Sequence, residues 1–255
     1  MAATRSDLRL LRWYVEMGAD EAIGWQAPDR LTAKDAAPDP SDPPEPAPGG
    51  HAAGAPPRAA VPAAAGGLAQ LEAAVRAFDG CALKRTATNT VFADGVAGAP
   101  LMIIGEAPGS DEDRLGRPFV GRSGQLLDRM LATIGFSRAT NAYITNILFW
   151  RPPGNRKPTG DEIAACLPFV WQHVALARPR AVLLCGGTAV SALVERNEGI
   201  MRLRGRWFDL KAPGLDAPIR ALATYHPSFL LRTPARKSEA WRDLLALEDH
   251  FRKPG

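Results

Sequence analysis

The sequence lacks the features that define membrane-embedded and disulfide-stapled proteins. No stretch of its 255 residues approaches the roughly 18 unbroken apolar residues of a membrane helix, and charges occupy the N-terminus where a signal peptide is apolar. Its three cysteines, Cys81, Cys166 and Cys185, are odd in number and form no CxxC pair. We therefore expect no disulfide framework, no membrane association and a cytoplasmic location.

The net charge of +4 is unevenly distributed along the chain. Residues 1–66 hold 6 Lys and Arg against 9 Asp and Glu, whereas the remaining residues hold 25 against 18. A basic folded body suits a polyanionic partner, because basic side chains that contact phosphates release condensed counterions. Charge alone does not separate a nucleic-acid surface from an ordinary solvated one.

Composition divides the chain into three parts. Apolar residues in the segment 1–25 recur with the spacing of a short helix, which either packs on the rest of the protein or docks on a protein partner. Residues 26–67 are crowded with Ala, Pro, Asp and Gly and have few large apolar side chains, so we expect a flexible linker. Residues 68–255 are expected to form one monomeric domain.

Short apolar runs alternate with helical periods after Gly67, which predicts a mostly parallel sheet with helices on both faces. Thr159 and Glu162 form a capping box that opens one of these helices. The expected strands are Leu101–Gly105, Ala142–Asn146, Ala181–Cys185 and Ile219–Thr224. The predicted fold class is a three-layer α/β/α domain with a central four-stranded, mostly parallel sheet.

Polar segments of unusual composition follow three of these strands. They are GEAPGSDEDRLGRPFVG at 105–121, Asn146 with FWRPPGNRKP at 149–158, and YHPSFLLR at 225–232. Ligands of such sheets bind beyond the carboxyl ends of the strands, so the three segments are expected to line one cleft. The first segment lacks the lysine of a P-loop and the GxGxxG spacing of a dinucleotide site.

In combination these segments resemble the uracil-DNA glycosylase superfamily, and in detail its family 4, over about residues 76–247. The resemblance rests on GEAPGSDEDRLGRPFVGRSGQLLDRML, YITNILFWRPPGNRKPT and ATYHPSFLLR, in the order and spacing of that family. It implies a nucleoid-associated DNA repair enzyme that flips uracil out of single- or double-stranded DNA. The enzyme then hydrolyses the N-glycosidic bond and leaves an abasic site.

The resemblance assigns the flipped base to five residues: Gly105, Ala107, Phe119, Asn146 and His226. Phe119 is the aromatic ring that the family places under the uracil. Asn146 carries an amide that both donates and accepts, so it can pair with O4 and N3–H of uracil while cytosine leaves buried groups unpaired.

Three residues are candidates for the chemical step. Bond cleavage leaves a cationic sugar and a uracil anion with charge on O2, and a neutral His226 can donate a hydrogen bond to that oxygen. Glu106 and Glu112 are the leading candidates for a carboxylate that orients water and stabilises the sugar. Spacing does not decide between them. Ala107 stands where another family of the superfamily carries its water-activating Asp.

The remaining polar and apolar residues of the second and third segments are candidates for DNA contacts. Arg151, Arg156 and Lys157 are expected to contact phosphates. Ser228 could hold the phosphate next to the flipped nucleotide, and Arg232, which follows the apolar residues 229–231, is a further candidate for a DNA contact. One of Phe229, Leu230 or Leu231 could fill the gap left in the base stack, the alternative being packing in the core.

The clearest departure from the family concerns iron. Family 4 enzymes usually hold a four-iron, four-sulfur cluster with four cysteines, and this chain has Phe78, Cys81, Trp150 and Cys166 at those positions. Two thiolates do not complete a cluster that needs a ligand on each iron. We therefore expect no metal and no organic cofactor, with Phe78 and Trp150 filling the space by packing.

Two other functions remain as alternatives. One is a relative that binds uracil-containing DNA without turnover or traps the sugar covalently. Such members carry a basic, histidine-bearing insertion after the first motif, whereas DRLGRPFVG runs through here without one. The other is a small-molecule nucleotide or nucleoside hydrolase on the same fold, which would leave the RPPGNRKP and HPSFLLR segments unexplained.

Overall fold

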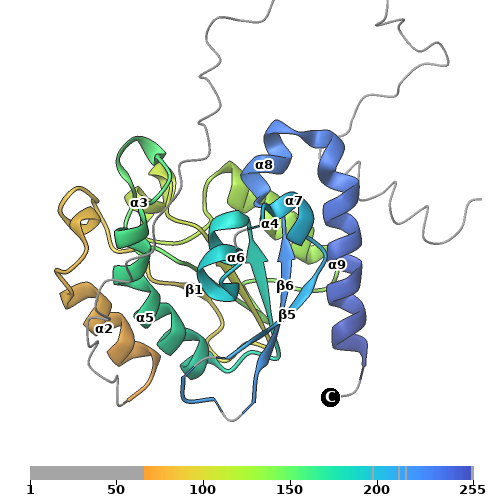
Figure 1. The fold of residues 1–255 in the computed structure, drawn as a ribbon, viewed down its shortest axis with the longest axis horizontal. Coiled ribbons are helices and arrows are strands. Elements are labelled where there is room, and N and C mark those ends of the chain that lie inside the picture. Colours follow the sequence, from red (N-terminus) through yellow and green to blue (C-terminus); the bar gives the residue numbers. More distant parts are fainter. Residues whose placement is uncertain (1–65, 197, 212, 216, 254–255) are drawn as a thin grey trace, which may run out of the picture.

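The computed structural model describes residues 66–196, 198–211, 213–215 and 217–253 as one α/β domain with three layers (Figure 1). The helix predicted for residues 1–25 and all but the last two residues of the predicted linker lie outside the described residues. Within the described part of the chain, no helix is long and apolar enough to cross a membrane.

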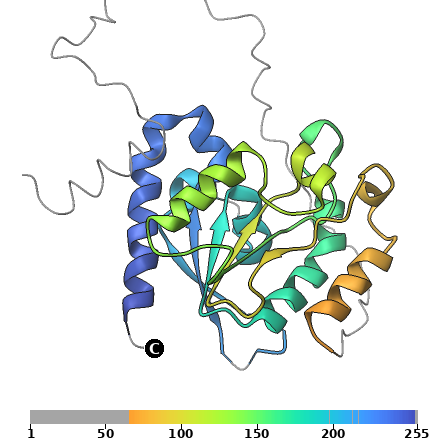
Figure 2. The same cartoon turned by 180° about the vertical axis from the view of Figure 1, so that it is seen from behind.

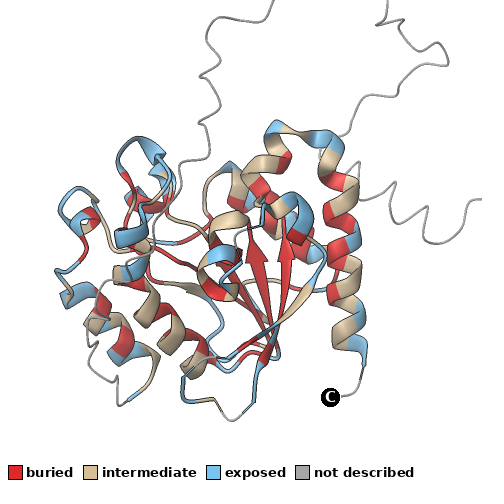
Figure 3. Cartoon of the chain, in the orientation of Figure 1, coloured by how far each residue is buried: buried red, intermediate tan, exposed pale blue. Residues whose placement is uncertain are grey.

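The core of the sheet consists of the four predicted strands at their predicted bounds. These are β2 (Leu101–Gly105), β3 (Ala142–Asn146), β4 (Ala181–Cys185) and β6 (Ile219–Thr224), which pair in parallel in the order β3-β2-β4-β6. Their residues are almost all buried, because helices cover both faces of the sheet (Figure 3). The predicted fold class is confirmed.

Two short antiparallel strands at the edges extend the sheet to six strands, which corrects the prediction of four. β1 (Asp94–Gly95) pairs with β3, and β5 (Trp207–Leu210) pairs with β6. Neither has the buried apolar run that marks a central strand: β1 is only two residues long, and most of β5 is incompletely buried. The pattern that identified the other four strands is therefore missing at both edges.

Alternating residues of the strands face two separate layers of helices. Leu101 and Ile103 pack toward α4 (Arg122–Ala132) and α9 (Lys237–Arg252). Met102 and Ile104 pack toward the opposite layer, which contains α2 (Leu68–Ala77), α5 (Gly160–Ala177) and α6 (Gly187–Val194). Figures 1 and 2 show these two layers from opposite sides.

Short helices complete the domain at the ends of these elements. They are η1 (Ala82–Arg85), α3 (Ser110–Leu115), η2 (Pro153–Asn155), α7 (Ile200–Leu203), α8 (Pro227–Arg232) and η3 (Pro234–Arg236). The predicted capping box at the start of α5 is present, with the backbone N–H of Glu162 donating to Thr159 Oγ1 at 3.3 Å and the N–H of Thr159 to the Glu162 carboxylate at 2.8 Å.

The carboxyl ends of the four parallel strands lie along one edge of the sheet. Gly105 at the end of β2 stands opposite Asn146 at the end of β3, and Cys185 stands opposite Thr224 at the ends of β4 and β6. The three polar segments predicted to meet all leave the sheet at this edge, where they surround a cavity.

Candidate active site

A cavity of about 500 Å³ lies at the carboxyl edge of the sheet. Eleven of the residues predicted to act at the site line it: Glu106, Ala107, Glu112, Phe119, Asn146, Arg156, Lys157, His226, Ser228, Phe229 and Arg232. They come from all three polar segments. The prediction that these segments share one cleft is therefore confirmed.

Gly105 allows the predicted base-binding side chains to approach each other. A Cβ atom on this residue would lie 2.4 Å from Asn146 Oδ1 and 2.5 Å from Phe119 Cζ. Any other residue would displace the amide or the ring. Gly105 thus acts through the space that it leaves, below the side chains that line the cavity.

Asn146 presents a buried acceptor without a partner. Its side chain is 2% exposed, and Oδ1 accepts no hydrogen bond from the described residues. A buried carbonyl left unpaired costs about 1–3 kcal/mol. A ligand that donates an N–H to this oxygen would recover that free energy, so the cavity favours a ligand with a donor at this point.

Phe119 is held in an unusual backbone conformation. Its φ of 53° lies in the left-handed region, which costs a residue with a side chain roughly 1–2 kcal/mol. The ring packs against the imidazole of His226, with centroids 5.4 Å apart and an interplanar angle of 28°. Strained residues of this kind persist where the surroundings determine them, often at functional sites.

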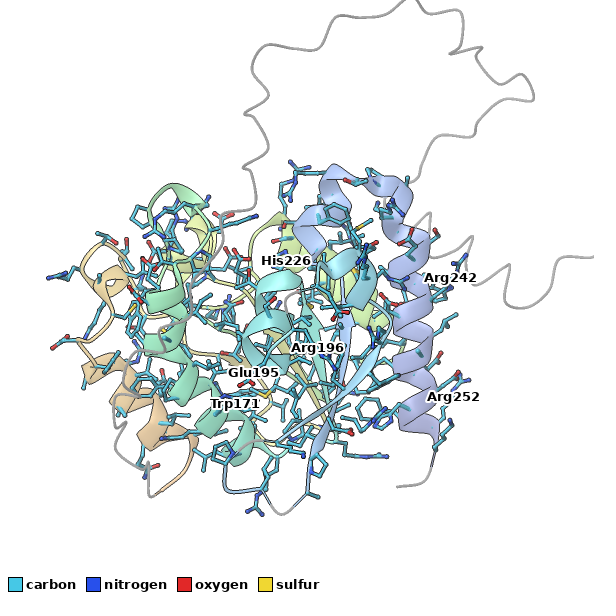
Figure 4. All side chains as sticks on the ribbon, in the orientation of Figure 1. Trp171, Glu195, Arg196, His226, Arg242 and Arg252 are labelled. Atoms are coloured by element: carbon cyan, nitrogen blue, oxygen red, sulfur yellow. The ribbon has the colours of Figure 1, made fainter. Side chains whose placement is uncertain are left out.

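His226 is oriented as a neutral hydrogen-bond donor. It caps the start of α8, and its Nδ1 accepts the backbone N–H of Ser228 at 3.1 Å, which leaves the ring proton on Nε2. Burial lowers the pKa of His226 from 6.5 to about 4, and the charge of Arg232 acts in the same direction. Figure 4 places His226 beyond the carboxyl ends of the strands.

Glu106 is held by a residue that the sequence analysis missed. Thr188, at the start of α6, donates from Oγ1 to Glu106 Oε2 at 2.5 Å, across 82 positions in the chain. This hydrogen bond fixes one carboxylate oxygen of Glu106. The side chain of Glu106 is only half-buried and lines the cavity. No local sequence pattern marks Thr188 for this role, because its partner lies 82 positions away in the chain.

Glu112 also lines the cavity, but its oxygens are occupied by backbone groups. They accept the N–H groups of Gly109, Val120 and Gly121 at 3.1, 2.9 and 2.8 Å. This carboxylate joins the start of α3 to the loop that carries Phe119. The two glutamates that spacing left equivalent therefore have different surroundings.

The predicted phosphate contacts differ in position. Arg156 and Lys157 are exposed and line the cavity, and Arg156 is also paired with Glu162 at 2.6 Å. Arg151 does not line the cavity; its Nε donates to Asn155 Oδ1 at 2.8 Å. The RPP segment therefore brings basic side chains to the entrance mainly through its second half.

The residues of α8 divide between the cavity and the core. Ser228, Phe229 and Arg232 line the cavity. Leu230 is fully buried in the core beneath α8, and Leu231 packs against the same core. Of the three apolar residues considered for the base stack, only Phe229 lies at the cavity.

The residues at the cluster positions of family 4 do not fit an iron-sulfur cluster. The thiols of Cys81 and Cys166 hydrogen-bond to each other in the core. Phe78 packs on Phe169 with centroids 4.9 Å apart, and Trp150 is buried. Among the described residues no group of three or more His, Cys, Asp and Glu could hold a metal ion. Cys185 is buried in β4.

The neutrality of His226 gives a test that does not depend on function. We expect the NMR resonance of its ring to stay unchanged from pH 8 to about pH 5, with the His226→Gln variant used for assignment. Because the folded pKa lies below the unfolded value, the neutral ring's contribution to stability is complete above about pH 6.5 and is lost as the pH falls toward 4. A midpoint near 6.5 in the folded protein would contradict this.

Comparisons with known proteins identify the family. Residues 92–245 match the model of the uracil DNA glycosylase superfamily. A type-4 uracil-DNA glycosylase of Pyrobaculum aerophilum is 36% identical over 181 residues, which cover 69% of this chain and 91% of the relative. One from Thermotoga maritima is 36% identical over 176 residues, covering 69% and 86%. A type-5 uracil-DNA glycosylase of Pyrobaculum aerophilum is 30% identical over 148 residues, covering 52% and 63%. The chain belongs to the uracil-DNA glycosylase superfamily and resembles its type-4 members.

Proposed function

We propose that this protein is a monofunctional uracil-DNA glycosylase, which flips uracil out of DNA and hydrolyses its N-glycosidic bond. The observation that carries the proposal is the cavity in which Phe119 and the unpaired carbonyl of Asn146 lie together over Gly105. The names of the type-4 relatives agree with it. The product is an abasic site in DNA, the first intermediate of base excision repair.

Base recognition follows from the two side chains above Gly105. The ring of Phe119 offers an apolar face for stacking, and Asn146 Oδ1 accepts N3–H of uracil while its amide donates to O4. Cytosine lacks the N3 donor and carries an amino group at position 4, so it leaves the buried oxygen unpaired. This mismatch excludes the parent base from which uracil arises by deamination.

Departure of the base depends on His226. Negative charge grows on uracil O2 as the bond breaks, and a donor fixed before the reaction stabilises the transition state more than the ground state. The proton on Nε2 of a neutral imidazole supplies this donor. Its orientation is supported by the bond that Nδ1 accepts from Ser228.

We propose that the carboxylate of Glu106 orients the water molecule that attacks the sugar. It is fixed through one oxygen by Thr188 and remains accessible from the cavity, so it can orient a water molecule and face the cationic sugar. Glu112 accepts three backbone N–H groups instead, which suits a role in holding the Phe119 loop. The chain's own residues thus supply the proposed step without a metal or an organic cofactor.

The DNA strand is proposed to cross the entrance of the cavity. Arg156 and Lys157 on one side and Arg232 on the other carry exposed positive charge next to the site. Ser228 and Phe229 line the cavity. Ser228 is proposed to hold the phosphate next to the flipped nucleotide, and Phe229 is proposed to fill the gap in the base stack. We propose a monomer that acts on DNA in the cytoplasm, at the nucleoid.

Packing replaces the iron-sulfur cluster in this proposal. Phe78 and Trp150 occupy two of the four ligand positions, and the indole N–H of Trp150 donates to Thr90 Oγ1 at 3.1 Å. Trp150 directly precedes the RPP segment, so its burial fixes the start of the loop that leads to Arg156 and Lys157. The two remaining thiols hydrogen-bond to each other.

The activity is tested with an oligonucleotide containing one uracil, followed by alkaline cleavage of abasic sites. We expect strand breaks at uracil and none at cytosine or thymine in the same position. Asn146→Ala, His226→Ala and Glu106→Gln should each slow single-turnover excision by about 10²–10³-fold, as removal of a preorganised polar group does. Arg220→Gln, at an exposed ion pair, serves as the control. Intact uracil DNA with excess folded wild-type enzyme would refute the proposed function.

The replacement of the cluster is tested by iron content and by stability. Protein purified without oxygen should be colourless and hold no stoichiometric iron. Trp150→Ala should lower the free energy of unfolding by about 3–5 kcal/mol, the usual cost of truncating a buried large aromatic side chain. Four irons per chain would contradict the first expectation, and unchanged urea denaturation of Trp150→Ala would contradict the second.

A further inference from the structure

The loop that carries Phe119 is bound on one side by a positive charge. Arg138, in the turn between α4 and β3, donates from Nη1 to the carbonyl oxygen of Pro118 at 3.1 Å and from Nη2 to that of Phe119 at 2.7 Å. A planar guanidinium can hold two neighbouring carbonyl groups at once, because its N–H groups point in fixed directions. Arg138 thereby contacts the loop directly at the residue with positive φ.

The other side of the same loop is bound by a negative charge. The next two backbone N–H groups, of Val120 and Gly121, donate to one carboxylate oxygen of Glu112 at 2.9 and 2.8 Å. The loop backbone thus binds two opposite charges. The carbonyl groups of residues 118 and 119 accept from the Arg138 cation, and the N–H groups of residues 120 and 121 donate to the Glu112 anion. Charged partners give the stronger hydrogen bonds in proteins, so this pair of ions favours the one backbone conformation that satisfies both.

Helix α4, which follows the loop, packs directly against the backbone of Phe119. A Cβ atom on Gly124, in the first turns of α4, would lie 1.9 Å from the carbonyl oxygen of Phe119. Only glycine lets the helix pack this closely on the strained residue. The carbonyl oxygen that touches Gly124 is the one to which Arg138 donates.

The guanidinium of Arg138 is itself fixed by two carboxylates. Asp94 on β1 accepts from Nη1 at 2.8 Å, and Asp128 on α4 accepts from Nε at 2.9 Å. Arg138 therefore links the edge strand, helix α4 and the loop, with its side chain only 19% exposed. Four hydrogen bonds hold the guanidinium on three sides, so the group has little freedom to move.

We propose that Arg138 is a positioning residue for base stacking, which holds Phe119 in the left-handed conformation that presents its ring to the cavity. The inference deepens the proposed function, since it rests on Phe119 as the platform for uracil. Arg138 itself is not among the residues that line the cavity. Its effect on excision passes through the loop backbone.

The first test measures the loop without any reference to activity. In Arg138→Gln the amides of Val120 and Gly121 should exchange with solvent deuterium at least about tenfold faster than in the wild type, because the loop opens locally. Arg220→Gln removes an exposed ion pair between β6 and Asp209 on β5, and it should leave the exchange rates of these two amides unchanged. Equal exchange rates in wild type and Arg138→Gln would overturn the proposal.

The second test is a double-mutant cycle on excision. Arg138→Gln should slow single-turnover excision of uracil by about 10- to 100-fold in the presence of Phe119, but by less than about threefold when combined with Phe119→Ala. Binding of DNA that already carries an abasic site should be unchanged, since no base is then stacked. Equal losses in both backgrounds, or an equal loss of abasic-site binding, would show that Arg138 does not act through Phe119.

A conservative variant guards against loss of folding. Arg138→Lys keeps the positive charge beside Asp94 and Asp128, but a single ammonium cannot reproduce the two-carbonyl fork. We expect it to fold, with exchange and excision between those of the wild type and Arg138→Gln. If Arg138→Lys exchanges its amides and excises uracil at wild-type rates, the two hydrogen bonds from the guanidinium to the carbonyl groups are not needed. If the wild type excises no uracil, the proposed function fails, while the exchange experiment still decides whether Arg138 holds the loop.

Discussion

The unpaired carbonyl oxygen of Asn146 is the constraint on which the rest of the site depends. A folded chain normally pairs such a buried group, and here nothing among the described residues does so. The oxygen stays buried because Asn146 ends a central parallel strand, where its neighbour Gly105 leaves the space for it. The sheet thus carries a fixed, unpaired acceptor that favours a ligand with a matching N–H donor.

The other parts of the site lie around this buried oxygen of Asn146 and hold the side chains next to it in place. The aromatic ring of Phe119 lies close to Gly105, and Phe119 has a left-handed backbone. Opposite charges at Glu112 and Arg138 and a glycine in α4 hold that backbone. Packing around the buried Trp150 is proposed to hold the loop that leads to Arg156 and Lys157.

The sequence predicted those features that depend on local pattern. The four buried apolar runs became the four parallel strands at the stated bounds, whereas the edge strands β1 and β5 have no such run and were missed. Side-chain roles set by distant contacts were not predictable. Three such contacts can be seen only in the folded chain. Thr188 bonds to Glu106, backbone amides of the loop bond to Glu112, and Leu230 is buried beneath α8.

The most direct test of the account compares two isomers as inhibitors of uracil excision. 1-Methyluracil keeps the N3–H that Asn146 accepts, whereas 3-methyluracil has the same size and lacks that donor. We predict that 1-methyluracil inhibits the wild type at a concentration at least about tenfold lower, as expected when a buried acceptor is left unpaired, and that Asn146→Ala removes this preference. Equal inhibition of the wild type by the two isomers would contradict the account.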